Sequence, residues 1–331
     1  MARLYFRFMR MRSSPFVAVA WQTARESLRQ PLVLLPTAAA LLVMAVLPLV
    51  VAYQFGDQGR LERDSALALH FVVGLIVAVA AASSSLSREI RSGTAALVLS
   101  KSVSRATFLL AKYAGLAIVI AVFSLSCAIG ALLAPRIGPQ HYAVDARVGT
   151  VFLAVPFLAF AVGGLLNYWR RQPFASAALA AMAGLSAAVL VWAAWTDRAG
   201  HLARFGASID WRVLPASVLL TLSLLVFGAI SLALATRVGT IPNLAACVLV
   251  LMVGLISDHL LAGPASAGSL MARTLYAVIP NWQHFWQSDA LAGAGTIPWG
   301  YVGWCALYGA ACAGGALALG LALFRHAEVE R

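Results

Sequence analysis

Residues 66–86 read A-L-A-L-H-F-V-V-G-L-I-V-A-V-A-A-A-S-S-S-L, an apolar run whose only ionisable side chain is His70. A helix of about 20 such residues crosses the roughly 30 Å hydrocarbon core of a bilayer. Strands with open edges and loops would leave backbone polar groups without hydrogen-bond partners in lipid. The run therefore predicts a transmembrane helix.

Apolar runs of similar length recur along nearly the whole chain. Hydrophobic residues make up 62% of the 331 residues and charged residues only 11%, whereas a soluble domain is about half apolar and a quarter charged. We therefore expect one all-α, polytopic membrane domain of six to eight transmembrane helices. Besides 66–86, the predicted spans are 32–55, 107–134, 148–169, 174–195, 213–236, 241–261 and 299–324.

The charges are distributed unevenly between the two sides of such a bundle. If the amino terminus is cytoplasmic and eight spans alternate, the inner segments hold 16 of the 24 Lys and Arg residues but 4 of the 12 acidic residues. The outer segments hold eight of each. By the positive-inside rule, both termini are predicted to be cytoplasmic, in a cell (inner) membrane. The basic excess then suits anionic lipid headgroups rather than nucleic acid.

The first 30 residues are predicted to form a basic cytoplasmic segment that precedes the membrane domain, residues 31–331. Within it, 13–30 reads as an amphipathic helix that Ser14 can cap and that Pro15 begins. Phe16, Val19, Ala20 and Thr23 share one predicted face. Such a helix can lie along the membrane surface. The alternative is a simple basic anchor.

The segment 87–113, S-R-E-I-R-S-G-T-A-A-L-V-L-S-K-S-V-S-R-A-T-F-L-L-A-K-Y, is a basic and polar connection between two apolar runs. Gly93 suits a left-handed helix end, and Thr94 can cap a short apolar helix over 95–99. Ser104 can cap the helix that continues into the next span. A short exposed apolar helix needs a partner to cover it.

The order of residues in this segment resembles the first cytoplasmic loop of ABC type-2 permeases. Ser102 stands where that family usually has proline, and six spans are usual there. The stretches T-A-R-E-S-L-R-Q-P-L (23–32) and L-F-R-H-A-E-V (323–329) resemble the family's lead into the first span and its basic carboxyl end. The positions that match the loop pattern are Glu89, Gly93, Thr94, Leu97, Leu99, Ser100, Lys101, Val103, Ser104, Arg105, Lys112 and Tyr113.

The resemblance implies the membrane-spanning subunit of an ABC exporter. Two such permeases, identical or paralogous, pair in the membrane, and each contacts a cytoplasmic ATPase whose closure pushes on the loop. The chain has no G-x-x-x-x-G-K-[ST] motif, so ATP and Mg²⁺ are expected in the partner subunit and no cofactor in this chain. The residues that the resemblance assigns to ATPase coupling are Glu89, Gly93, Thr94, Lys101, Arg105 and Lys112.

A few polar residues within or beside the spans are candidates for a transport pathway, because ionisable groups in lipid are energetically unfavourable. They are His70, Asn167, Asp258 and His259. Each lies within a few residues of a predicted interface, where a purely structural role is the alternative.

The outer loop 262–298 contains N-W-Q-H-F-W-Q-S-D-A-L (281–291), with Trp282, Phe285 and Trp286 on one helical face. This pattern predicts a segment at the outer interface or dipping into it, as an aromatic belt or as a lid over substrate.

Other function classes have weaker support. The chain has no H-E-x-x-H or G-x-S-x-G motif, so no enzyme activity is expected. Its four cysteines lie within predicted spans, without metal-site spacing. No acidic residue lies at the centre of a span, which disfavours ion coupling. A secondary transporter or a non-transporting scaffold subunit remains the alternative.

Overall fold

A computed structural model describes residues 14–50, 59–91, 104–139, 143–266 and 268–326. These residues form helices joined by short connections, and no strand is present among them. A short helix, α2 (Pro15–Leu28), precedes the first long one. Another short helix, α11 (Leu270–Val278), and two 3₁₀ turns, η1 (Trp282–His284) and η2 (Asp289–Leu291), lie between the last two long helices.

Eight helices in the described residues are long and apolar enough to cross a membrane, which confirms the predicted all-α, multi-pass bundle. The predicted span 174–195 matches its helix at both ends, whereas the second and third spans continue several residues beyond their predicted ends. The eight are α3 (Pro31–Val50), α4 (Arg60–Arg91), α6 (Arg105–Ile137), α7 (Ala146–Arg170), α8 (Phe174–Trp195), α9 (Val213–Leu234), α10 (Thr240–Ser266) and α12 (Trp299–His326).

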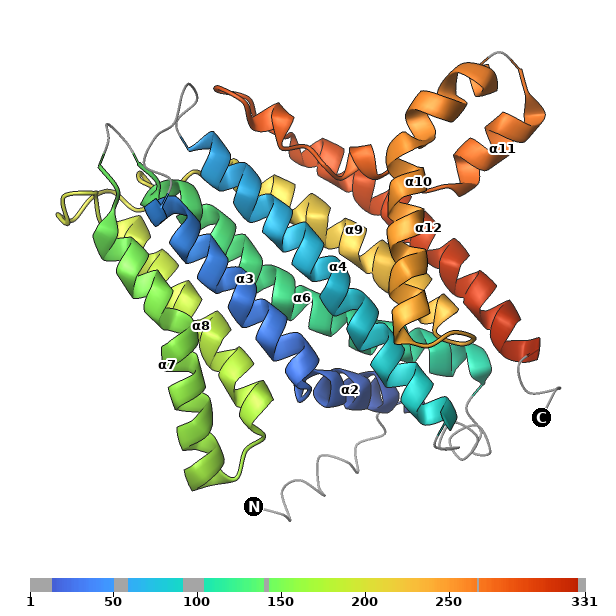
Figure 1. The fold of residues 1–331 in the computed structure, drawn as a ribbon, viewed down its shortest axis with the longest axis horizontal. Coiled ribbons are helices and arrows are strands. Elements are labelled where there is room, and N and C mark those ends of the chain that lie inside the picture. The colour runs from blue at the N-terminus through green and yellow to red at the C-terminus, as the bar shows by residue number, and fades with distance from the viewer. Residues whose placement is uncertain (1–13, 51–58, 92–103, 140–142, 267, 327–331) are drawn as a thin grey trace.

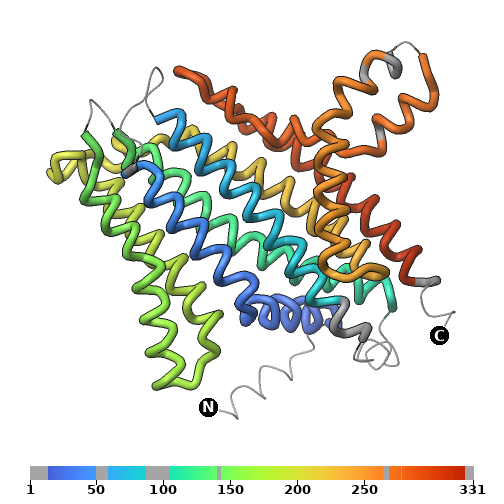
Figure 2. Tube along the Cα trace, in the orientation of Figure 1, coloured from blue at the N-terminus to red at the C-terminus, as the bar shows by residue number. Residues whose placement is uncertain are grey.

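The long helices run alternately up and down the bundle (Figure 1 and Figure 2). One end, which we call the α2 end, holds α2, the close of α4, the start of α6, the α7–α8 and α9–α10 turns and the close of α12. The opposite end holds the 196–212 connection and α11. The described start and finish of the chain therefore lie at the same end.

Helices α4, α6 and α9 form the centre of the bundle. In the 18-residue apolar stretches of α6 and α9, 67% of the residues are buried, against 17% in α10 and 28% in α12. Helix α7 packs on α8 at one flank and α12 packs on α9 at the other. The exposed apolar faces of α10 and α12 suit contact with lipid chains.

Asn243, in the first turn of α10, fastens this weakly packed helix to the centre. Its side-chain amide is fully buried and donates to Ser83 Oγ of α4 at 2.8 Å. The same group lies 2.9 Å from the carbonyl and 3.0 Å from the hydroxyl of Ser231 in α9. Side-chain hydrogen bonds between transmembrane helices stabilise their association. Asn243 therefore links three helices near the α2 end.

The aromatic segment 281–291 inserts into the bundle. Trp282 is 2% exposed, stacks on Phe227 of α9 with ring centroids 4.0 Å apart, and donates its indole N–H to the Val250 carbonyl of α10 at 3.1 Å. Phe285 is equally buried. Gly254 of α10 admits this packing, because a Cβ there would lie 2.3 Å from the Pro280 carbonyl oxygen.

The expectation of an interfacial belt or a lid is thus wrong for Trp282 and Phe285. The expectation of one continuous helical face is also wrong, because the segment consists of two short 3₁₀ turns joined by irregular chain. The buried rings fill the space between α9, α10 and α12 instead.

We expect Trp282→Ala to lower the free energy of unfolding by about 3–5 kcal/mol, because it removes a buried ring and leaves a cavity. Thermal unfolding in detergent measures the loss. Trp304→Ala is the matched control, since Trp304 is 74% exposed on α12 and should change stability little. Equal losses in the two variants would contradict the buried position of Trp282.

Candidate functional site

The candidate site is the α2 end of the bundle, where the predicted coupling segment 87–113 includes the end of α4 and the start of α6. Glu89 lies in the last turn of α4, and Arg105 is the first residue of α6. Gly93, Thr94, Lys101 and the short helix predicted over 95–99 lie outside the described residues. The structure therefore locates the two ends of the segment.

Ser104 caps α6 as predicted. Its hydroxyl oxygen accepts a hydrogen bond from the Thr107 amide at 3.1 Å, and the two hydroxyl groups lie 2.8 Å apart. A cap satisfies one of the amide groups that have no partner inside the helix. The cap fixes the residue at which the chain from the predicted coupling segment enters the bundle.

Lys112, which the resemblance assigns to ATPase coupling, is enclosed by the bundle. Its side chain is buried, with the residue 2% exposed, and its ammonium lies 5.6 Å from the centre of the Phe108 ring, within the range of a cation–π contact. The Phe108 ring stacks in turn on Phe324 of α12 at 6.4 Å. Lys112 therefore supports the start of α6 from inside and is not exposed for docking.

Helix α2 lies directly on α6. A Cβ at Gly115 of α6 would come within 2.4 Å of the Ala20 carbonyl oxygen and 2.7 Å of Thr23 Cβ. The buried face of α2 consists of small residues, Ala20, Thr23, Ala24 and Ser27.

The predicted α2 face was therefore only partly correct. Of the face predicted to lie on the membrane, Phe16 is exposed and Val19 is half-buried, while Ala20 and Thr23 are buried against α6. The close backbone approach at Gly115 explains the difference, because it leaves room for small side chains alone. Trp21 faces outward and is available to the interfacial region of the membrane.

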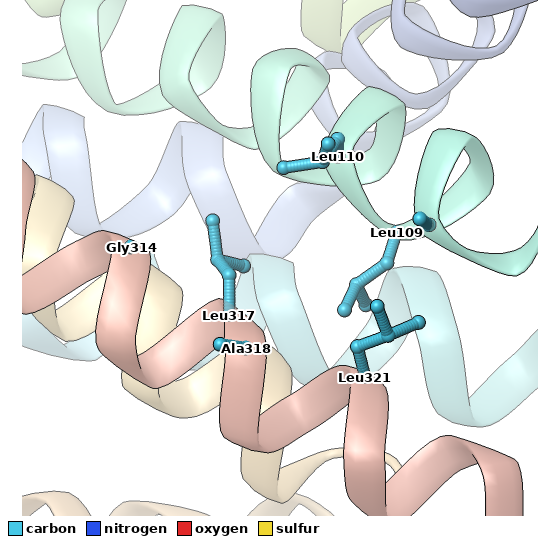
Figure 3. A pocket seen from close by; sticks show the side chains of 7 residues that line it. Leu109, Leu110, Gly314, Leu317, Ala318 and Leu321 are labelled. Carbon is cyan, nitrogen blue, oxygen red and sulfur yellow. The ribbon is translucent and has the colours of Figure 1, made fainter.

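An apolar pocket of about 230 Å³ lies between α6 and α12. Figure 3 shows Leu109 and Leu110 of α6 facing Leu317 and Leu321 of α12 across it, with Gly314 at one side. Such a lining offers no hydrogen bond to a ligand. It suits an acyl chain or an apolar side chain.

The structure does not bring the four candidate pathway residues together. His70 is fully buried in α4, 6.0 Å from the Phe123 ring of α6, and neither imidazole nitrogen has a hydrogen-bond partner. This burial favours the structural alternative for His70 over a role in a pathway. It is a buried imidazole enclosed by neighbouring helices.

The other three residues have local surroundings. Asn167 is exposed at the α7–α8 turn, where its amide donates to the Gln172 carbonyl at 2.6 Å. Asp258 of α10 accepts a hydrogen bond from the Tyr276 hydroxyl of α11 at 2.8 Å, which raises the pKa of Tyr276. His259 is exposed on α10. These contacts fix turns and helix pairs rather than line a common route.

Two polar features were not singled out from the sequence. The first is Asn243, whose amide oxygen lies 3.6 Å from the Cys247 thiol one helical turn later. A polar amide within an apolar run could have indicated a functional or structural site from the sequence alone. The other is a buried ion pair between Arg136 and Asp145. Arg136 follows an apolar run directly, so the sequence presented it as an ordinary helix end.

Comparisons with known proteins do not identify a family for the chain. No family model matches the chain, and no curated protein matches it. In the described part of the chain, no cluster of three or more His, Cys, Asp or Glu side chains is placed to hold a metal ion.

We expect Gly115→Ala to destabilise the protein by about 1–3 kcal/mol, because the methyl group would overlap the α2 backbone. Gly184→Ala is the matched control, since nothing lies within 4 Å of a Cβ at that helical glycine and alanine favours a helix by about 1 kcal/mol. Unfolding midpoints in detergent should therefore move in opposite directions. A stabilised Gly115→Ala variant would show that α2 is not seated on α6.

Proposed function

We propose that the chain is the membrane-spanning subunit of an ABC exporter in the cell (inner) membrane, driven by ATP hydrolysis in a separate cytoplasmic subunit. The ATPase docks on the segment 87–113, and a second permease, identical or paralogous, completes the transporter. The observation that carries the proposal is the residue order of this segment, together with the helices to which it is attached.

The connection of the segment 87–113 to α4 and α6 supports the proposal, because both helices are long and lie at the centre of the bundle. At about 1.5 Å per residue, each is close to 50 Å long, against roughly 30 Å of hydrocarbon. Both helices contact α9 and each other. Force applied where α4 ends and α6 begins would therefore reach the centre of the bundle.

The surroundings of α6 offer a way to transmit such a push. Phe108 and Phe324 join its first turns to α12, Gly115 seats α2 upon it, and the Tyr113 hydroxyl donates to the Leu225 carbonyl of α9 at 3.3 Å. A shift of α6 would move these three neighbours together. Well-packed interfaces transmit displacement between discrete arrangements.

The charge distribution supports the proposed sidedness. Arg170 and Arg171 lie at the α2 end, with no acidic residue in that turn. At the opposite end, several arginines pair with carboxylates, as in Arg212 with Asp210. An excess of Lys and Arg in short loops favours the cytoplasmic side.

Coupling predicts that Glu89→Ala and Arg105→Ala lower substrate-stimulated ATP hydrolysis by about tenfold or more, while the folded chain remains intact. The measurement is ATP hydrolysis by the tagged chain purified in mild detergent from its own host, with co-purifying proteins identified by mass. Arg147→Ala is the matched control, because Arg147 lies in the first turn of α7 at the opposite end.

Two outcomes would contradict the proposal. The first is a purified, active chain that carries no ATPase. The second is transport that stops when the proton gradient collapses while ATP persists, which would favour a secondary transporter. A stable complex without any transport would instead favour a scaffold subunit.

Sidedness can be tested separately with single cysteines. Ala199→Cys, in the exposed 196–212 connection, should react with a membrane-impermeant maleimide in intact cells. Arg171→Cys, in the exposed α7–α8 turn, should react only after the cells are opened. The native Cys127, Cys247 and Cys305 are buried, and Cys312, which is partly exposed, is replaced by alanine to keep the background low. The reverse pattern would invert the topology and place the proposed docking segment outside.

A further inference from the structure

A polar cavity of about 460 Å³ opens at the end of the bundle opposite α2, between the close of α6 and the 196–212 connection. Five charged side chains line it, Arg136, Asp197, Arg198, Asp210 and Arg212. Its size lies in the range of small-molecule sites. No residue expected to couple or to form a pathway lines it.

Arg136 is the buried arginine of this cavity, with its side chain 1% exposed. One terminal nitrogen pairs with Asp145, whose other carboxylate oxygen caps α7 by accepting from the Val148 amide at 3.1 Å. The Nε and second terminal nitrogen of Arg136 have no hydrogen-bond partner. Buried donors without acceptors are energetically unfavourable and rare.

Arg198 adds a second guanidinium to the same wall. It donates to the Gly138 carbonyl at 2.9 Å and the Pro135 carbonyl at 3.3 Å, which places its charge at the carboxyl end of α6. Burial lowers the pKa of Arg198 and the neighbouring charge of Arg136 lowers it further, whereas Asp145 and Glu62 oppose that shift. An anion between the two guanidinium groups would relieve their repulsion.

The carboxylates that line the cavity are engaged elsewhere. Asp210 holds Arg212 through two bonds, at 2.8 and 3.0 Å. Asp197 accepts from the His201 amide at 2.8 Å. Glu62 packs against Gly138, behind the wall of the cavity, since a Cβ atom added at Gly138 would lie 2.8 Å from Glu62 Oε1. None of these oxygens hydrogen-bonds the two remaining nitrogens of Arg136.

We propose that this cavity binds a ligand through a carboxylate or phosphate group held by Arg136 and Arg198. A guanidinium offers parallel donors that match the oxygens of either group. The anion would be a free solute or the headgroup of a lipid that enters from the bilayer. The site uses no residue of the proposed ATPase-docking segment and does not depend on what drives the protein.

The test uses the full chain in phosphatidylcholine nanodiscs, with calorimetric titration at constant ionic strength. Inorganic phosphate is one probe and dihexanoyl phosphatidic acid, a soluble short-chain lipid, is the other. We expect at least one probe to bind, and Arg198→Gln to weaken that binding by about tenfold or more. Arg198→Lys, which keeps the charge, should retain part of the affinity.

The role of Arg136 needs a paired variant, because Arg136→Gln alone would leave the buried Asp145 without its partner. Arg136→Gln combined with Asp145→Asn keeps a neutral pair and should also weaken binding by about tenfold or more. Arg273→Gln, on exposed α11 at the same end, is the matched control and should bind like the unaltered chain. Melting curves confirm that each variant is folded.

The outcomes separate the sources of the anion. Binding of phosphate identifies a free solute, and binding of phosphatidic acid without phosphate identifies a lipid headgroup. Absence of binding by both probes would overturn the proposal. Equal affinity in the folded Arg198→Gln and paired variants would overturn it as well. Because no ATPase is present, either failure leaves the exporter proposal untouched.

Discussion

The requirement that backbone polar groups be satisfied inside lipid governs this structure. It makes each crossing a helix. The lipid itself removes the hydrophobic drive that brings soluble helices together, since lipid chains are as apolar as leucine. Association then depends on close contact between backbones. Gly163 of α7 shows the result, because a methyl group added there would lie 3.0 Å from the Ala178 backbone nitrogen of α8.

The same requirement determines where buried polar side chains occur. Asn243 satisfies its amide group with acceptors from two other helices, and it fastens a helix that has few other contacts with the centre. At the opposite end, Asp145 both caps α7 and neutralises Arg136. Each group joins elements that apolar packing alone would leave free to slide. His70 differs, since it is buried without a hydrogen-bond partner.

The sequence predicted the transmembrane helices well, because length and apolarity suffice to identify a span. It predicted the Ser104 cap from a few adjacent residues, whereas Ser14, predicted to cap α2 in the same way, makes no side-chain hydrogen bond to the first turn of that helix. The positions of Lys112 and Trp282 were not predictable in this way. Their burial depends on helices that are distant in the sequence. Helices α2 and α12 cover the first turns of α6, which include Lys112, and helices α9 and α10 enclose Trp282.

Helix α6 connects the two regions to which we assign functions. It begins at Arg105, where the proposed docking segment enters the bundle, and its last turn holds Arg136 and the carbonyl groups that Arg198 caps. A continuous helix of this length transmits an axial shift or a rotation with little loss, because each turn is hydrogen-bonded to the next. A displacement of α6 at the α2 end would therefore move Arg136 and the carbonyl groups that hold Arg198. Binding at the cavity would, by thermodynamic linkage, bias the docking end in return.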